Sequence, residues 1–243
     1  MSDSLTAKLD ALALSVEYPC NYLPGLLARQ QHFYWPPSEG TVSGAFYQRL
    51  MDARFRRSGR LFYRPVCDSC SRCIPIRLRV AEFQPSESQR RSVKKNPDVT
   101  IEWVKPTIDD ERIALYARYG QQRHDAAATR DTATELEQFL YDSPTDTVES
   151  VYRVDGKIIA IGICDLTPDA LSSVYFYFEP TLSKRSLGVY SALQEIAYTA
   201  ETARPYYYLG YWVEGCRKMD YKAAFADHEL LVDGVWEKHV RRL

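Results

Sequence analysis

The clearest hydrophobic pattern in the chain lies between residues 171 and 226. From Leu171 to Phe178, apolar residues alternate with tyrosines at a period of two, which predicts a strand that carries Tyr175 and Tyr177 on one face. After Ser186 the spacing becomes helical, with apolar residues at Val189, Leu193, Ile196 and Ala200. The pattern therefore predicts strand, helix and then a second strand at 206–213.

A cationic segment precedes this helix. Glu179-Pro180 ends the first strand, and Lys184-Arg185-Ser186 comes directly before the first helical turn. The first backbone N–H groups of a helix have no partner within it, so the turn is suited to bind a phosphate or a carboxylate. A loop and short helix after the second strand add four more polar residues to this region: Cys216, Lys218, Tyr221 and Lys222.

The earlier part of the chain alternates short strands with helices. We predict strands at 30–35, 61–66 and 74–80, and a strand or linker at 99–104. Ser43 caps a predicted helix that extends to Arg54, and Ser86 caps another that stops at Asn96-Pro97. In the strand at 74–80, Arg77 and Arg79 alternate with apolar residues, which predicts a row of arginines on an open face.

From residue 107 onward the predicted elements have the order of the acyltransferase fold shared by the N-acetyltransferases. Helices are predicted at 107–124 and 134–141, and Asp155-Gly156 and Asp233-Gly234 are hairpin signals. We predict an α+β fold, with a mixed sheet flanked by helices and a smaller N-terminal α/β region that contains the cysteines. The predicted domains are residues 1–100 and 101–243.

Composition is that of an ordinary globular protein. Of the 243 residues, 45% are hydrophobic and 26% are charged. No apolar run approaches the roughly 20 residues of a membrane span, and the N-terminus has no basic segment typical of a secretion signal. We therefore predict a cytoplasmic location and no membrane partner; the sequence indicates no oligomeric state.

The net charge of −1 conceals a strong segregation. Residues 49–95 contain 13 basic and four acidic side chains, whereas residues 96–150 contain five basic and 12 acidic ones. A basic block of this kind is typical of contact with a phosphate backbone, and it is equally typical of a solvated basic face beside an acidic one. The predicted contact for RNA is the helix that begins after Ser86, with Arg90, Arg91, Lys94 and Lys95.

Six cysteines in a cytosolic chain point to metal binding or reactivity rather than disulfides. Cys67, Cys70 and Cys73 have the spacing C-x-x-C-x-x-C, and Cys20 supplies a fourth thiol. Four thiolates suit zinc or an iron-sulfur cluster. The alternative is a cysteine-rich turn with reduced thiols. Cys216 is predicted to line the site beside Lys218.

Several motifs, in order along most of the chain, resemble the aminoacyl-tRNA-protein transferase family, and in particular its bacterial branch. They are C-x-x-C-x-x-C and the segments CNYLP at 20–24, VYFYFEP at 174–180, SLGVYS at 186–191 and YYLGYWVEGCRKMDYK at 207–222. The resemblance implies transfer of leucine from leucyl-tRNA to proteins that begin with Asp or Glu, which marks them for degradation by the N-end rule pathway. It also implies an iron-sulfur cluster at the N-terminal cysteines, although the family's other form has a second cysteine where this chain has Leu23.

Transfer from an aminoacyl ester to an amine requires positioning, removal of a proton and stabilisation of an oxyanion, and it requires no cofactor. We predict catalytic roles for Tyr175, Tyr177, Arg185, Lys218 and Tyr221. The cations Lys184, Arg185, Lys218 and Lys222 are candidates to recognise the acidic side chain of the acceptor protein. The predicted substrate-binding residues are Lys184, Ser186, Gly188, Tyr190, Tyr211, Cys216 and Lys222, and the resemblance adds Arg123 and His124.

Three alternatives stay open. A coenzyme A-dependent acyltransferase would share the fold, but Tyr190 occupies a position where a pyrophosphate would approach the backbone. A zinc-containing RNA-binding module without catalysis would explain the basic block and the cysteines. Arginine instead of leucine as the donor is excluded only by the resemblance.

Overall fold

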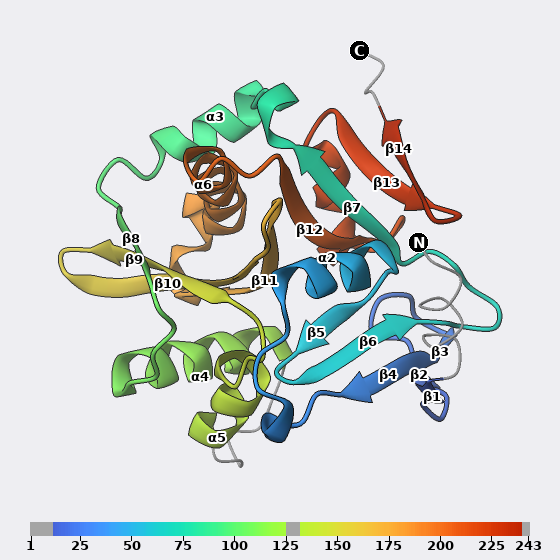
Figure 1. The fold of residues 1–243 in the computed structure, drawn as a ribbon. Helices are drawn as coiled ribbons and strands as arrows, with labels where there is room; N and C mark the ends of the chain where they lie inside the picture. The colour runs from blue at the N-terminus through green and yellow to red at the C-terminus, as the bar shows by residue number, and fades with distance from the viewer. Residues whose placement is uncertain (1–11, 125–131, 240–243) are drawn as a thin grey trace.

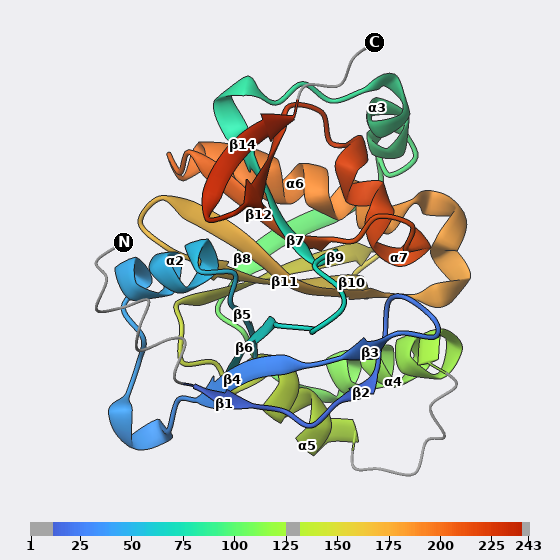
Figure 2. The same ribbon diagram turned by 90° about the vertical axis from the view of Figure 1, so that its right-hand side faces the viewer.

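The computed structural model describes residues 12–124 and 132–239 (Figures 1 and 2). Its centre is an eight-stranded mixed sheet with the order β14-β13-β7-β12-β11-β10-β9-β8. These strands are β7 (Ile74–Arg79), β8 (Thr100–Val104), β9 (Thr147–Val154), β10 (Lys157–Leu166), β11 (Ala170–Phe178), β12 (Tyr206–Trp212), β13 (His228–Val232) and β14 (Val235–His239). The predicted α+β class, a mixed sheet flanked by helices, is confirmed.

The N-terminal region adds two small sheets. One has the order β1-β4-β6-β5 and the other pairs β2 with β3. Their strands are β1 (Ala13–Leu14), β2 (Tyr18–Pro19), β3 (Leu27–Ala28), β4 (Gln30–Tyr34), β5 (Arg56–Ser58) and β6 (Leu61–Pro65). The helices are α2 (Gly44–Asp52), α3 (Glu87–Lys94), α4 (Asp110–His124), α5 (Thr132–Leu136), α6 (Leu187–Glu201) and α7 (Arg217–Asp220), with short turns η1 (Pro37–Glu39), η2 (Val80–Glu82), η3 (Glu137–Tyr141), η4 (Pro180–Arg185) and η5 (Tyr221–Ala224).

Helices cover both faces of the large sheet. Figure 2 shows α6 and α3 above the sheet, and α4, α5 and the four-stranded sheet below it. The upper core joins Leu193 and Ile196 of α6 to Leu171 and Tyr207 of the sheet, and the lower core joins Leu115 of α4 to strands β10 and β11. The alternation of apolar residues in β11 therefore serves two cores, one on each face.

Strands β11 and β12 form the single parallel pair among the described strands, and they stay paired only briefly. The pairing runs from Ala170 opposite Tyr206 to Ser172 opposite Tyr208, and then it ends. On the other side of β12, the register with β7 shifts between Tyr208 and Gly210, and Gly210 has a φ of 91°. This left-handed backbone favours glycine, and the irregularity turns β12 away from β11.

The predicted division into residues 1–100 and 101–243 stays a prediction. Strand β7, from the first of these regions, lies between β12 and β13 near the middle of the large sheet (Figure 1). The two regions therefore share one sheet, and the ring of Phe62 in β6 belongs to the same buried cluster as Tyr208 in β12.

Local signals placed most element boundaries correctly. The Oγ atom of Ser43 accepts a hydrogen bond from Phe46 N at 3.3 Å, and Ser86 forms a capping box with Gln89. Helix α4 begins at Asp110 rather than at Thr107, because Asp109 accepts the hydrogen bond from Arg112 N. The second helix, predicted at 134–141, divides into α5 and a π-helical turn, η3.

The predicted open row of arginines on β7 is wrong for Arg77. Its guanidinium donates to Glu229 at 2.6 Å and lies 4.0 Å from the ring centroids of both Tyr206 and Trp236. The β13–β14 hairpin, which pairs with β7 in the same sheet, supplies the carboxylate and the tryptophan. Arg79, in contrast, is exposed.

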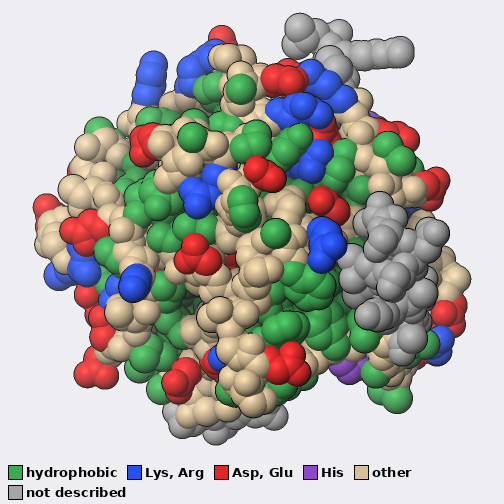
Figure 3. Space-filling view, in the orientation of Figure 1, with side chains coloured by type: hydrophobic (Ala, Val, Ile, Leu, Met, Phe, Trp, Pro, Cys, Tyr) green, Lys and Arg blue, Asp and Glu red, His purple; other side chains and the backbone are tan. Residues whose placement is uncertain are grey.

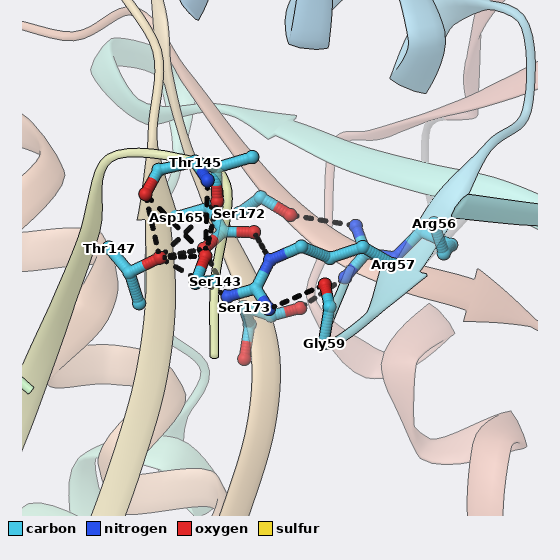
Figure 4. A network of polar contacts seen from close by, with 9 residues as sticks. All are labelled: Arg56, Arg57, Gly59, Ser143, Thr145, Thr147, Asp165, Ser172 and Ser173. Carbon is cyan, nitrogen blue, oxygen red and sulfur yellow. Dashed lines mark hydrogen bonds and ion pairs between the residues drawn. The ribbon is translucent and has the colours of Figure 1, made fainter. Parts of the chain in front are cut away.

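Other arginines of the basic block are also internal. Arg57 of β5 forms a two-pronged ion pair with Asp165 of β10, with both N–O distances at 2.6 Å and both side chains fully buried (Figure 4). Thr147 donates to the same carboxylate at 2.8 Å. Because the partners come from the small and large sheets, this network fixes their relative position. The charge of residues 49–95 is therefore only partly available to a partner.

Candidate functional site

A cavity of about 570 Å³ opens where β11 and β12 separate. Its walls are the second half of β11, the start of α6, most of β12 and the α7–η5 segment. Tyr22, Ser183 and single residues of β5, β6 and α4 complete it. The short parallel pairing and the bend at Gly210 thus create the space. Cavities at such breaks in a sheet are common ligand sites.

The charge of the lining has one sign. Four cations line the cavity, and none of its described lining residues is Asp or Glu. Arg217 and Lys218 are exposed at the rim, whereas Arg56 and Lys222 are each only 8% exposed. Such a lining favours anionic ligands strongly, since nothing within the cavity neutralises the cations.

Seven tyrosines share the lining with these cations. They are Tyr22, Tyr63, Tyr119, Tyr175, Tyr207, Tyr211 and Tyr221. Of the predicted residues among them, Tyr221 is 45% exposed, Tyr175 is partly buried, and Tyr211 is buried and donates its hydroxyl hydrogen bond to Arg54 O. Aromatic rings of this kind can stack on a nucleobase, and hydroxyls can donate to a carbonyl.

The start of α6 forms one wall, as the sequence predicted. Ser186 has a left-handed φ of 59°, which turns the chain into the helix, and Ser186, Leu187 and Gly188 all line the cavity. The ammonium group of Lys95, just after α3, donates to Lys184 O at 3.3 Å and to Ser186 Oγ at 3.4 Å. Helix α3 is therefore fastened to the rim of the cavity.

The buried pair of cations lies at the inner end, beside Gly210. Lys222 Nζ donates to Tyr211 O at 2.9 Å, and Arg56 donates to Ser172 Oγ at 2.7 Å and to Ser173 O. Figure 4 shows this contact of Arg56 with β11. Burial, and secondarily the charge of Arg56, lowers the pKa of Lys222 to about 7.

A buried acid lies behind the wall. Glu195 of α6 is 1% exposed, and its Oε2 accepts a hydrogen bond of 2.7 Å from the hydroxyl of Tyr207, whose ring lines the cavity. Its Oε1 has no hydrogen-bond partner in the described part of the chain. Burial raises the pKa of Glu195 to about 7, against the opposing effect of the Tyr207 hydrogen bond.

Several predicted site residues do not line the cavity. Tyr177 is fully buried, and its hydroxyl lies 3.1 Å from that of Tyr141 on the α4 side of the sheet, so its position argues against a catalytic role. Cys216 packs among Leu23, Tyr211 and Val213 in the core. Its burial leaves no thiol at the cavity surface.

Arg185 and Lys184 lie outside the lining as well. The guanidinium of Arg185 forms two hydrogen bonds to Asp98, at 2.7 and 2.8 Å, so its charge is already matched by a carboxylate. Lys184 is exposed beside the rim. The predicted catalytic role of Arg185 and the predicted substrate contact of Lys184 are therefore not supported by their positions.

Tyr190 does not occupy the position expected for it. Its ring packs in the core against Tyr152, with centroids 6.1 Å apart, and against Phe178 and Leu187. It does not block the start of α6, so the steric argument against coenzyme A was wrong. The predicted residues Arg123 and His124 close α4, and their side chains lie outside the described part of the structure.

Sequence reasoning missed Arg56, Arg217, Tyr207 and Glu195. Arg56 stands in a basic run where no pattern distinguishes it from Arg57, and Glu195 looks like one polar residue on an amphipathic helix. Arg217 directly precedes Lys218, so the same cationic segment contained a signal for it.

The four N-terminal cysteines line a second, smaller cavity of about 140 Å³, and Tyr22, Tyr63 and Tyr211 separate it from the first. Cys20 Sγ accepts a hydrogen bond from Leu23 N at 3.4 Å, and Cys67 Sγ accepts one from Arg29 N at 3.5 Å. Within residues 12–124 and 132–239, no three His, Cys, Asp or Glu side chains are arranged to hold a metal ion. The metal-site prediction therefore stays a prediction.

Comparison with family models decides the family. Residues 18–91 match the model described as "Arginine-tRNA-protein transferase, N terminus", and residues 111–232 match the one described as "Arginine-tRNA-protein transferase, C terminus". The chain belongs to the arginine-tRNA-protein transferase family. The motifs at 20–24, 67–73 and 174–222 all lie within these two matches, and the implied membership is confirmed.

Named relatives within this transferase family cover nearly the whole chain. An aspartate/glutamate leucyltransferase of Hahella chejuensis is 38% identical over 221 residues, which are 90% of this chain and 93% of the relative. One of Thiobacillus denitrificans is 38% identical over 225 residues, which are 92% of each chain. The chain is therefore similar in length as well as in sequence to these leucyltransferases.

Solved structures resemble this transferase more distantly. The C-terminal domain of a putative lysylphosphatidylglycerol synthetase from Agrobacterium fabrum has a TM-score of 0.47 and 17% identity, covering 76% of this chain and 55% of that one. FemX has a TM-score of 0.45 and 11% identity, covering 71% and 61%.

None of the helices within residues 12–124 and 132–239 combines the length and apolar composition needed to cross a membrane.

Proposed function

We propose that this chain transfers leucine from leucyl-tRNA to the N-terminal amine of proteins that begin with Asp or Glu, and so marks them for degradation. The observation that carries the proposal is the cavity between β11 and β12, whose described lining holds four cations, seven tyrosines and no carboxylate. Both substrates bring anionic groups to it. The names of the relatives that are 38% identical support the choice of donor and acceptor.

The proposed reaction needs no covalent enzyme intermediate. The α-ammonium group of the acceptor loses a proton, and its nitrogen then attacks the ester carbonyl of leucyl-tRNA. A C–N bond forms, the C–O bond to the terminal ribose breaks, and the ribose hydroxyl leaves with the second proton lost by nitrogen. The protein must orient the two substrates and stabilise the oxyanion.

Lys218 and Tyr221 are well placed for these tasks. Both line the cavity, and both are exposed enough to meet a substrate. An ammonium or hydroxyl group can donate to the oxyanion that develops on the ester carbonyl. Tyr175 lies in the facing strand and is proposed to contact the terminal adenosine.

A path for the RNA backbone leads to the cavity over α3. Arg90, Arg91, Lys94 and Lys95 are exposed on or directly after this helix, and basic side chains gather along the upper edge of the molecule there (Figure 3). Lys95 and Asn96 hydrogen-bond the η4–α6 segment at the rim. These exposed cations are proposed to follow the phosphates of the acceptor stem.

The leucine side chain requires an apolar part of the same cavity. Leu187 and Met219 line it together with Val174 and Leu209.

Label transfer with purified protein tests the proposal. Peptides that begin with Asp, Glu, Lys or Ala are offered with leucyl-tRNA, arginyl-tRNA or acetyl-coenzyme A. Only the Asp and Glu peptides are expected to gain leucine. Transfer of arginine or of an acetyl group would show that the donor is different. Transfer of leucine to the Lys peptide would show that the acceptor is different.

The same proposal extends to the cysteines. No three of the cysteines converge in the described structure, but Cys20, Cys67, Cys70 and Cys73 line one cavity, and two of them accept backbone N–H bonds, as metal thiolates do. They are proposed to turn inward around zinc or an iron-sulfur cluster. The bound group would fasten the segment around Cys20 to the loop of residues 67–73. Elemental analysis of anaerobically purified protein is expected to find metal that Cys70→Ser lacks; metal-free wild-type protein would contradict this.

A further inference from the structure

Two buried cations converge on one glycine at the inner end of the cavity. A Cβ atom added to Gly210 would lie 3.4 Å from Lys222 Nζ and 3.6 Å from Arg56 Nη2. Both side chains line the cavity, although each is only 8% exposed. Gly210 thus lies beside both cationic groups, and it places no side chain between them.

Neither cation has a carboxylate partner in the described structure. Arg56 donates to Ser172 Oγ and Ser173 O, and Lys222 donates to Tyr211 O, all of them neutral acceptors. Arg57, the neighbour of Arg56, is fully matched by Asp165. Burial and the charge of Arg56 lower the pKa of Lys222 to about 7. An anion that arrives with a substrate would favour the protonated form of Lys222 and match both charges.

The location indicates which anion this is. A phosphodiester belongs to a long chain that must follow the surface, where the exposed rim cation Arg217 can meet it. The inner end suits a single short group that enters on a free chain terminus. An aspartate or glutamate side chain at the N-terminus of a protein has this form, and a guanidinium with an ammonium can bind its carboxylate from two sides.

We propose that Arg56 and Lys222 bind the side-chain carboxylate of the acceptor's N-terminal Asp or Glu, and so determine the specificity of the transfer. This inference rests on the proposed function. Lys222 was already a candidate for recognition from the sequence, whereas Arg56 was not. The carboxylate would lie between the two cations over Gly210 and remove their mutual repulsion. An amide in its place would leave both charges unmatched, which is the physical basis for rejecting Asn and Gln.

The test compares matched peptides that begin with Asp or Asn, and with Glu or Gln, as leucine acceptors. Lys222→Gln and Arg56→Gln are expected to lower the Asp-to-Asn ratio of kcat/KM at least tenfold, mainly by raising KM for the acidic peptide. Lys222→Arg and Arg56→Lys keep a cation and are expected to retain most of the ratio. The rim variant Arg217→Gln is the matched control. It is expected to change kcat/KM for the Asp and Asn peptides by the same factor, and likewise for the Glu and Gln peptides.

An unchanged ratio in the glutamine variants would overturn the proposal. A rise in KM for leucyl-tRNA that is the same for every peptide would also overturn it, because the pair would then bind phosphate. If Arg56→Gln does not fold, as judged by thermal unfolding, the Lys222 variants decide. Absence of leucine transfer by the wild-type protein would instead refute the proposed function, and the two failures are thus distinguishable.

Discussion

Replacing Glu195 by glutamine is expected to stabilise the protein by about 2 to 3 kcal/mol more at pH 8 than at pH 5. The buried carboxyl group of Glu195 keeps its proton to a pKa of about 7, whereas a glutamate in the unfolded chain loses it near pH 4.3. Between these values the folded state binds more protons than the unfolded state. Its free energy of unfolding therefore falls as the pH rises through this window, and stays low above it.

Glutamine removes this titration and keeps an acceptor for the Tyr207 hydroxyl. Denaturant unfolding at pH 5 and pH 8 measures the free energy of unfolding of the wild type and of Glu195→Gln. In the difference between the two proteins at each pH, the titrations that they share cancel. Glu201→Gln, an exposed position on the same helix, is the matched control. If the free energies of unfolding of Glu195→Gln and the wild type differ by the same amount at pH 5 and pH 8, Glu195 is not held in the protonated form.

The fold was predictable wherever local chemistry sets the structure. The hairpins at Asp155-Gly156 and Asp233-Gly234 form with positive φ at all four residues, and Ser43 and Ser86 cap the expected helices. The strand at 171–178 and the helix after Ser186 appear almost as their periodicity indicates. These signals need no knowledge of distant contacts.

What the sequence did not reveal depends on such contacts. The alternation along β7 places Arg77 correctly on one face, but the β13–β14 hairpin, more than 140 residues later, supplies Glu229 and Trp236, which help to bury it. The same holds for Arg57, which a partner in β10 buries. The count of basic residues along the chain therefore overestimates how many basic side chains are exposed to bind RNA.

The site shows the same division. Motif positions that line the cavity, among them Ser186, Gly188, Lys218 and Tyr221, were found because they belong to two short motifs that can be read from the sequence. Arg56 comes from a separate sheet and was missed. Tyr177 was included because it shares a strand face with Tyr175, yet it lies too deep to reach the cavity.

The central claim is that the cavity between β11 and β12 accepts the charged end of the tRNA. Gly188 offers a direct way to fill it, since a Cβ atom there meets nothing within 4 Å and the residue lines the cavity. A tryptophan at this position is accommodated without a backbone clash and occupies space that the substrate needs. Glycine is also a poor helix former, so the substitution is not expected to weaken α6.

Gly120 in α4 is the matched control, because it too is a helical glycine with open space around it, and it does not line the cavity. The decisive measurement is kcat/KM for leucine transfer to an Asp peptide by Gly188→Trp and Gly120→Trp. We expect a loss of at least about 100-fold in the first, about 2.7 kcal/mol of transition-state stabilisation, and a rate within about threefold of wild type in the second. Wild-type transfer by a folded Gly188→Trp protein would contradict the account.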